Sequence, residues 1–289
     1  MLDCVVRYSE SDGEKRTRHL DAVGVASRVW SVAKIAGLDQ MGVSVRRIEP
    51  PNAGTARHYH EIEEEWAYVL SGAGVVRIGP HRLDVRAGSF VAFPPGPRPH
   101  HFVADDDSAI VLLEGGERHR DGEVVHYVDL GFRLSRESGQ HSDEPGGPEQ
   151  GDADQCLHVS AAEAFDFQHP VEPRSLRYIR SLHTATGLSR QAVRWAQVRA
   201  GSLTTAFHTH DRTEEWVYIL EGSAELRVGD ERQAVGAGDF IGHRAGSAPH
   251  CMEAATELTY LMGGQIDVDD VVLYPEAALQ LRGDTLVPL

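Results

Sequence analysis

Two stretches of the sequence place a pair of histidines close to a glutamate, and these residue types bind metal ions. The stretch HYHEIEEEWAYVLSG begins at residue 58, and HTHDRTEEWVYILEG begins at residue 208. The residues that recur, each 150 positions later, are His58, His60 and Glu65 in the first stretch and His208, His210 and Glu215 in the second. Alternate side chains of a strand point to the same side, so the two histidines of each pair share one face. The sequence therefore predicts an internal repeat with a metal-binding cluster in each copy.

A fourth candidate ligand follows in each copy at the same offset. GSFVAFPPGPRPHHF aligns with GDFIGHRAGSAPHCM, which places His100 on His250. Three neutral imidazoles and one carboxylate suit a divalent first-row metal, and on an octahedral ion they leave two positions for water, dioxygen or a chelating substrate. The three cysteines include no C-x-x-C pair, so a thiolate zinc site is not indicated. The pattern favours a catalytic metal site.

The elements around these residues are predicted to be strands. Turns rich in Gly and Pro separate short runs of β-branched and aromatic residues in both halves, which is typical of an all-β sandwich or barrel. A length of 289 residues and the repeat agree on two domains. We expect an N-terminal domain at 1–135, a flexible acidic linker rich in Gly and Pro at 136–155, and a C-terminal domain at 156–289.

The repeated motifs resemble those of the cupin superfamily. Its first motif is matched by Gly54, His58, His60, Glu65 and Gly72, and its second by Gly88, Pro94, Gly96 and His100, with one extra residue before the histidine. Ala104 and Ala254 stand where the second motif usually has Asn. The resemblance implies a bicupin with two tandem jelly-roll β-barrels and one divalent metal per domain. Fe(II) is expected first, with Mn, Ni, Cu or Zn as alternatives.

The two sites are not predicted to be equivalent. Strand alternation sends Ala67 and Val69 into the first cavity but the larger Val217 and Ile219 into the second, so the second cavity should be tighter and the first barrel the active one. Trp66, Tyr68 and Leu70 point the other way, and we expect them to pack between sheets rather than at an interface between barrels.

Several further residues are candidates for direct roles in chemistry. Arg98 is the predicted anchor for a substrate carboxylate at the first site, and His243 or Arg244 takes this role at the second. His101 is a candidate acid or base with a pKa near neutrality. Glu65 is expected to remain a ligand or to swing away and accept a proton.

Three classes of function fit this pattern. The first is a dioxygenase, an oxidoreductase whose substrate chelates the metal through adjacent oxygens. The second is a redox-neutral isomerase, lyase or decarboxylase in which the metal acts as a Lewis acid. The third is a non-enzymatic module that binds a small ligand. We expect the first class, with a small-molecule substrate, and the resemblance suggests a homodimer.

Composition excludes other partners. A formal net charge of −16 disfavours nucleic acid and anionic membranes, because both are bound through clustered Lys and Arg. No apolar run approaches the roughly 20 residues that span a bilayer. The start of the chain has no basic region followed by an apolar one, so no secretory signal is predicted and a cytoplasmic location is expected.

Overall fold

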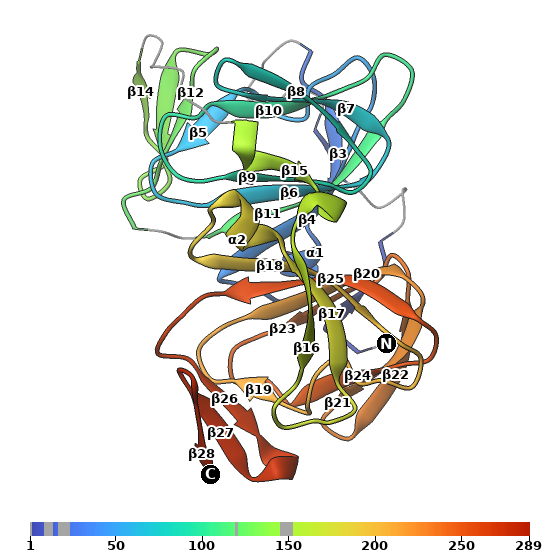
Figure 1. The fold of residues 1–289 in the computed structure, drawn as a ribbon. Coiled ribbons are helices and arrows are strands. Elements are labelled where there is room, and N and C mark those ends of the chain that lie inside the picture. Colours follow the sequence, from blue (N-terminus) through green and yellow to red (C-terminus); the bar gives the residue numbers. More distant parts are fainter. Residues whose placement is uncertain (1, 9–13, 17–23, 119–120, 145–152) are drawn as a thin grey trace.

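Two β-barrels lie one above the other in the computed structural model (Figure 1). It describes residues 2–8, 14–16, 24–118, 121–144 and 153–289. The first barrel is built from two sheets of seven strands each, and the second from sheets of seven, four and three strands. Every pairing between neighbouring strands in these sheets is antiparallel.

The sheets of the first barrel have the orders β15-β9-β6-β11-β4-β3-β2 and β14-β13-β12-β5-β10-β7-β8. Their strands are β2 (Glu14–Arg16), β3 (Ser27–Trp30), β4 (Met41–Ile48), β5 (His58–His60), β6 (Glu65–Ser71), β7 (Ala73–Ile78), β8 (His81–Arg86), β9 (Ser89–Phe93), β10 (His100–Ala104), β11 (Ile110–Glu117), β12 (Val124–Tyr127), β13 (Phe132–Ser135), β14 (His141–Asp143) and β15 (Cys156–His158).

The sheets of the second barrel have the orders β1-β23-β20-β25-β18-β17-β16, β19-β26-β27-β28 and β22-β21-β24. Their strands are β1 (Val5–Val6), β16 (Ala164–Gln168), β17 (Leu176–Ser181), β18 (Gln191–Val198), β19 (Thr209–His210), β20 (Glu215–Glu221), β21 (Ser223–Val228), β22 (Glu231–Gly236), β23 (Phe240–His243), β24 (His250–Ala254), β25 (Leu258–Gln265), β26 (Val271–Tyr274), β27 (Leu279–Arg282) and β28 (Thr285–Pro288). The helices are α1 (Val32–Ile35), α2 (Leu182–Thr186), η2 (Ala153–Gln155), η3 (Val159–Ala161) and η4 (Pro275–Ala277).

A layer of aromatic and aliphatic side chains joins the two barrels. Strand alternation sends Ala67 into the core of the first barrel, whereas Trp66 and Tyr68 belong to a cluster that also contains Trp216 and Tyr218. The rings of Trp66 and Trp216 stack with their centroids 5.1 Å apart. The expectation that this face packs only between sheets was therefore wrong, because the apolar face of β6 is covered by the apolar face of β20.

The barrels also exchange short strands. β1, at the N-terminal end, pairs with β23 of the second barrel, and β15 pairs with β9 of the first. The predicted boundaries at 1–135 and 156–289 therefore need correction, since each barrel completes a sheet with a segment assigned to the other domain. Strands of two or three residues are too short to show an alternation of apolar and polar side chains, so the sequence cannot assign them to a sheet.

The predicted linker at 136–155 is only partly tested. Within it, β14 pairs with β13 in a sheet of the first barrel, and Gln155 is buried. These parts are therefore structured rather than flexible. Residues 145–152 lie outside the described residues.

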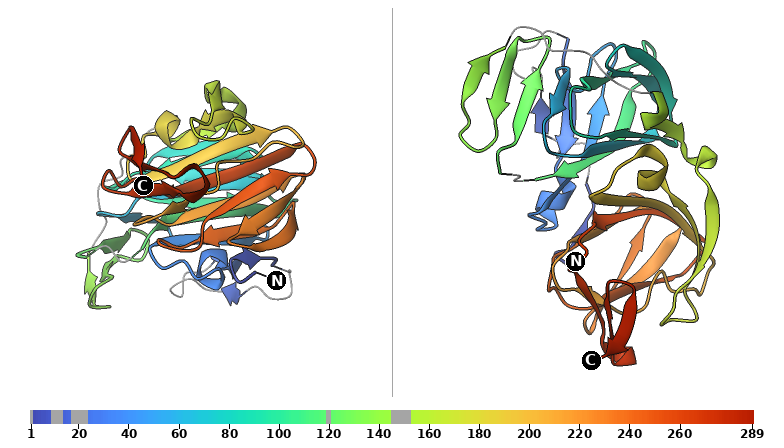
Figure 2. Two further views of the ribbon diagram at one scale, coloured as in Figure 1. Left: turned by 90° about the horizontal axis from the view of Figure 1, so that it is seen from below. Right: turned by 60° about the vertical axis from the view of Figure 1, so that its left-hand side comes forward.

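Two groups of strands extend from the sides of the barrels. β12–β14 extend from the first barrel and β26–β28 from the second (Figure 2). The first strand of each group pairs with the strand that carries the two repeated histidines, β12 with β5 and β26 with β19. Each group thereby brings an additional segment to a histidine pair.

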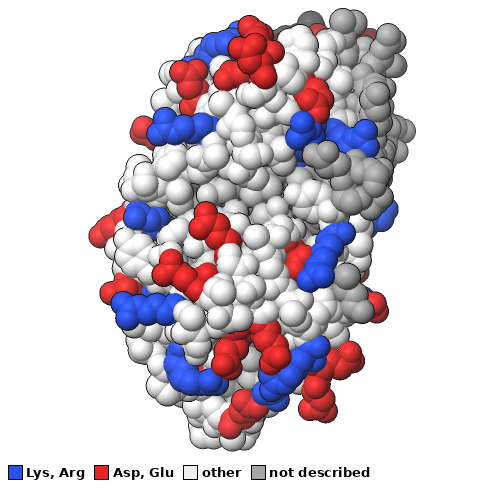
Figure 3. Space-filling model, turned by 90° about the vertical axis from the view of Figure 1, so that its right-hand side faces the viewer, with Lys and Arg blue, Asp and Glu red and all other residues white. Residues whose placement is uncertain are grey.

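Charges of both signs are interspersed on the surface. On the face in Figure 3, Lys and Arg side chains alternate with Asp and Glu rather than forming one basic area. Among the described residues, no helix has the length and apolar character required to cross a membrane.

Candidate metal centres and cavities

The three predicted histidines of the first barrel are oriented in the same way. Each ring is held at Nδ1: His58 by the Ala56 carbonyl at 2.8 Å, His100 by the Arg98 carbonyl at 3.0 Å, and His60 by a carboxylate oxygen of Glu123 at 2.9 Å. An Nδ1 that donates to these acceptors leaves Nε2 as the lone-pair atom. Backbone carbonyls therefore fix which nitrogen of His58 and His100 can bind a metal, and the Glu123 carboxylate does so for His60.

The free ring nitrogens converge on one carboxylate. Glu65 Oε2 lies 3.5, 3.3 and 3.2 Å from Nε2 of His58, His60 and His100. β5 supplies the first two histidines, β10 the third, and β6 begins at the glutamate. The structure therefore brings together all four ligands predicted for this barrel.

The second barrel repeats the arrangement. Glu215 Oε2 lies 3.2, 3.9 and 3.0 Å from Nε2 of His208, His210 and His250. Nδ1 of His210 contacts Asp270 at 2.6 Å, and Nδ1 of His208 contacts a backbone carbonyl at 2.9 Å. Both predicted sets of four are thus assembled in equivalent places.

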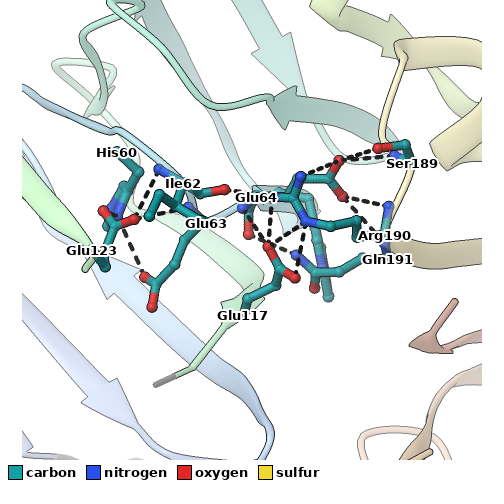
Figure 4. Close-up of polar contacts among 10 residues, drawn as sticks. His60, Ile62, Glu63, Glu64, Glu117, Glu123, Ser189, Arg190 and Gln191 are labelled. Carbon is teal, nitrogen blue, oxygen red and sulfur yellow. Dashed lines mark hydrogen bonds and ion pairs between the residues drawn. The ribbon is translucent and has the colours of Figure 1, made fainter. Parts of the chain in front are cut away.

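Glu123 and Asp270 contact the second histidine of each cluster, and the sequence did not indicate either residue. Glu123 is fully buried, contacts His60 and accepts hydrogen bonds from the backbone N–H groups of Ile62 and Glu63 (Figure 4). Asp270 makes the corresponding contacts in the second barrel. The two carboxylates are 147 residues apart and differ in type, so the alignment at an offset of 150 misses them. A search for acids just before β12 and β26 would have found them.

The clusters fit a divalent metal on the chemistry of their donors. Nε2 of His60 is buried and lacks a hydrogen-bond partner in the described part of the chain. A buried nitrogen with a free lone pair is suited to bind a metal ion. Burial acts to raise the pKa of Glu65, yet the proximity of His60, His100 and His58 to the carboxylate holds that pKa well below its usual value. Burial lowers the pKa of His100 to about 4, so that ring is neutral and ready to ligate.

A polar cavity of about 300 Å³ opens beside the first cluster. Arg46 lies on its wall and is buried, with Nε 2.8 Å and Nη2 2.7 Å from the Glu114 carboxylate. Nη1 donates to Ser27 and to the Gly54 carbonyl. These contacts occupy four of the five N–H groups of Arg46, and one on Nη2 is left for a ligand.

Arg98 and His101 occupy different places from those expected. Arg98 donates to the Pro95 carbonyl at 2.7 Å and is not among the residues that line the cavity. His101 does line it, but burial and the nearby Arg77 lower its pKa to about 4 rather than leaving it near neutrality. The geometry therefore favours Arg46 over Arg98 as the substrate anchor.

The second cavity measures only about 30 Å³. Val217 lines it, whereas Ile219 does not, so the predicted narrowing rests on one of the two residues named. His243 also lines it and stacks on the ligand His250 with ring centroids 3.4 Å apart. Arg244 is exposed and does not line this cavity.

The fold and the paired His–Glu clusters define a chain with two cupin domains. A family model described as a cupin domain matches residues 46–115 and 194–263, and these ranges contain both sets of four ligands. The protein is therefore a bicupin, and the predicted fold of two tandem jelly-roll barrels is confirmed.

Solved structures of similar fold include oxalate decarboxylases. A mutant of the Bacillus subtilis oxalate decarboxylase is 19% identical, covers 93% of this chain and 79% of its own, and has a TM-score of 0.62. A structure of the same enzyme, described for its Mn(II) centres, is 18% identical over 93% of this chain and 79% of its own, with a TM-score of 0.61. A putative sugar phosphate isomerase from Acidithiobacillus ferrooxidans is 29% identical over 45% of this chain and 87% of its own, with a TM-score of 0.43. No curated protein matches the sequence.

Proposed function

We propose that the first barrel is the active site of a metal-dependent lyase that acts on a small, oxygen-chelating carboxylate by a redox-neutral, decarboxylase-type reaction. The observation that carries this proposal is the Arg46–Glu114 pair on the wall of the cavity that also holds His58, His60 and Glu65. A guanidinium fixed by a carboxylate presents a preorganised donor, which is how anionic substrates are oriented.

The charged wall favours this class over the dioxygenase that the sequence led us to expect. Dioxygen is apolar and gains little from ion-pairing groups, whereas a carboxylate that loses carbon dioxide needs its changing charge stabilised. The fold is shared with oxalate decarboxylases, which at 19% identity bears on the fold alone, so the charged wall carries the choice of reaction class. The proposed substrate is therefore a class, small dicarboxylates and 2-keto acids, and the dioxygenase remains an untested alternative.

The residues of the first cavity have separable roles in this proposal. His58, His60, Glu65 and His100 hold a divalent ion, which when bound supplies a Lewis acid that polarises a substrate oxygen. Arg46 holds a substrate carboxylate through its remaining N–H. In decarboxylation a carbon–carbon bond breaks, carbon dioxide leaves, and the carbon that keeps the electron pair takes a proton. We assign the handling of that proton to His101, whose Nε2 is buried beside the cavity without a partner among the described residues.

The size of the cavities supports the first barrel as the proposed place of turnover. A volume of about 300 Å³ accommodates a substrate of several heavy atoms, whereas about 30 Å³ is close to the space that one water occupies in the liquid. The second centre is therefore proposed as a metal site without turnover of the same substrate.

The test is an assay of carbon dioxide release and oxygen uptake with the full chain loaded with Mn²⁺ or Fe²⁺. A panel of small dicarboxylates and 2-keto acids is incubated with and without air. We expect carbon dioxide release without oxygen consumption, lost in the His58→Ala/His60→Ala variant and kept in His208→Ala. Stoichiometric oxygen uptake would support the dioxygenase instead. Turnover that depends on His208 and not on His58 would show that the second barrel is the active one.

A further inference from the structure

The second barrel contains a buried arginine that forms no ion pair with an Asp or Glu of the described residues. Arg177, on β17, is 9% exposed and lines the small cavity beside the metal centre. Its Nε is buried without a hydrogen-bond partner among the described residues, Nη1 contacts the Met262 sulfur at 3.7 Å, and the guanidinium carbon lies 4.8 Å from the centroid of the Phe167 ring. Among the described residues, no Asp or Glu lies within 4.0 Å of this guanidinium. A buried guanidinium that lacks an acceptor is costly, so the site is incomplete as it stands.

A second donor is aimed at the same place. The hydroxyl of Tyr260 lines the cavity, is buried, and has no partner among the described residues. Burial raises the pKa of Tyr260 to about 12 against the lowering effect of the neighbouring Arg177 guanidinium, which faces the Tyr260 oxygen, so the hydroxyl stays protonated and able to donate. Two unsatisfied donors in one cavity call for a ligand that only accepts.

The contrast with the first barrel shows what is missing. Strand register places Ala196 at the position of Arg46, because Arg47 and Gln197 have the same partners on β3 and β17 one repeat apart. Met262 takes the position of Glu114, since these residues pair with Val217 and Ala67. The second barrel therefore keeps a guanidinium on a neighbouring strand but has replaced its carboxylate by a thioether.

The local charge balance also favours an anion. Arg194 lies close enough that burial and the like charge of Arg177 lower its pKa. Among the described residues that line the cavity, Glu215 is the only carboxylate. Two guanidinium groups, Arg177 in the lining and Arg194 close to it, therefore face one carboxylate before any divalent ion is added.

We propose that the second barrel binds a small monovalent anion, of the size of a halide or a one-carbon carboxylate, on the Arg177 guanidinium and the Tyr260 hydroxyl. The volume of about 30 Å³ sets the size limit. The donors belong to the chain itself, so this site is independent of the reaction proposed for the first barrel. Leu226, Ile241 and Met252 form apolar walls that exclude competing water and strengthen the charge-assisted contact.

Bromide is the probe for this site. Thermal unfolding of the full chain is followed as sodium bromide replaces sodium gluconate at constant ionic strength, since gluconate is too large to enter. We expect the unfolding midpoint to rise with the logarithm of bromide concentration, because a ligand that binds only the folded state stabilises it. Sodium formate should act in the same way. Arg199→Met, which removes an exposed cation from the same barrel, should respond like the wild type.

Two variants and one crystal measurement decide the outcome. Arg177→Met should show no bromide dependence, and Tyr260→Phe should need a several-fold higher concentration for the same rise. An anomalous difference peak for bromide should lie within hydrogen-bond distance of Arg177 Nε, and this decides the question even if Arg177→Met does not fold. An equal midpoint rise in Arg177→Met, or a bromide-soaked crystal without a peak at Arg177, would overturn the proposal.

Discussion

Glu64 and Glu214 each bind the barrel to which they do not belong. The Glu214 carboxylate accepts hydrogen bonds of 2.7–3.1 Å from three successive backbone N–H groups of the first barrel, those of Asp39, Gln40 and Met41. The Glu64 carboxylate accepts bonds of 2.9–3.2 Å from the equivalent groups of the second barrel, those of Ser189, Arg190 and Gln191 (Figure 4). Each glutamate precedes a metal ligand, so each centre is held in place by the opposite barrel.

Replacing Glu64 by Gln should destabilise the folded chain. The carboxylate is 1% exposed and accepts hydrogen bonds from three backbone N–H groups and the Ser189 hydroxyl, whereas an amide offers one oxygen and turns an NH₂ group toward N–H donors. We expect a loss of about 2 kcal/mol in the free energy of unfolding, the usual size for charge-assisted bonds in a buried site. Denaturant titration measures it. Glu221→Gln, on the exposed end of β20, is the control and should change stability by less than about 0.5 kcal/mol.

The two barrels should unfold in one transition. Trp66, Trp216 and their neighbours form a single apolar cluster across the interface, and β1 and β15 are exchanged between barrels. Each barrel has a core of its own, but separating the barrels would expose the shared cluster at a cost of about 25 cal/mol for each Å² of apolar surface, so we expect the two halves to unfold together. Calorimetry and near-UV circular dichroism should give coincident midpoints. Two resolved transitions would show that the interface is weaker than its packing indicates.

The metal ligands could be predicted from the sequence, but the residues that contact and orient them could not. His58, His60, Glu65 and His100 recur without insertion, and strand alternation alone puts the paired histidines on one face. Glu123 arrives from a separate group of strands, and nothing in its local pattern distinguishes it from a solvated acid. Arg46 was missed for a related reason, since its partner Glu114 lies 68 residues away on a strand that becomes its neighbour only in the sheet.

The all-β class and the tandem arrangement were predictable for the same reason, because turns and β-branched runs are local signals. The interface between the two barrels could not be predicted in this way. Alternation shows that Trp66 and Ala67 point in opposite directions, but it cannot show whether a sheet of the same barrel or of the other one covers the outer face. The exchanged strands, of two and three residues, are too short for any pattern.

Metal content should be about two divalent ions per chain, one in each barrel. His58→Ala/His60→Ala should lower the content to about one while the second centre stays loaded, because the two clusters share no ligand. The backbone fold should survive, since the apolar cores do not contain the cluster. Elemental analysis of protein purified without chelator gives the stoichiometry. An empty wild-type protein would contradict the assignment of both centres.

Glu123 and Asp270, which contact the second histidine of each pair, should each control the metal affinity of their own centre. Glu123→Gln removes the charge that orients His60 and should weaken the first centre by about 10- to 100-fold. Asp270→Asn should weaken only the second, where Asp270 contacts His210. Competition with a fluorescent chelator measures both constants. Glu61→Gln is the matched control, because Glu61 contacts His126 rather than a ligand, and an equal loss in this variant would remove the special role of Glu123.

Arg46 and Arg98 give opposite expectations for turnover. Arg46 lines the first cavity with one N–H left for a substrate, whereas Arg98 is bonded to its own loop and lies outside the lining. Arg46→Lys keeps a positive charge beside Glu114. It loses the planar guanidinium that is fixed by Glu114, and with it the remaining N–H that is proposed to hold the substrate carboxylate. We expect kcat/KM to fall about tenfold or more, which corresponds to a loss of roughly 1.4 kcal/mol or more in transition-state stabilisation.

Arg98→Gln is the comparison for this experiment and should leave kcat/KM within about twofold of the wild type, because Arg98 is half-buried against its own loop and does not line the cavity. Circular dichroism and metal content establish that both variants fold and load. A large loss in Arg98→Gln with full activity in Arg46→Lys would restore the substrate anchor that the sequence alone indicated, and would mean that the loop before His100 moves its arginine into the cavity when substrate binds.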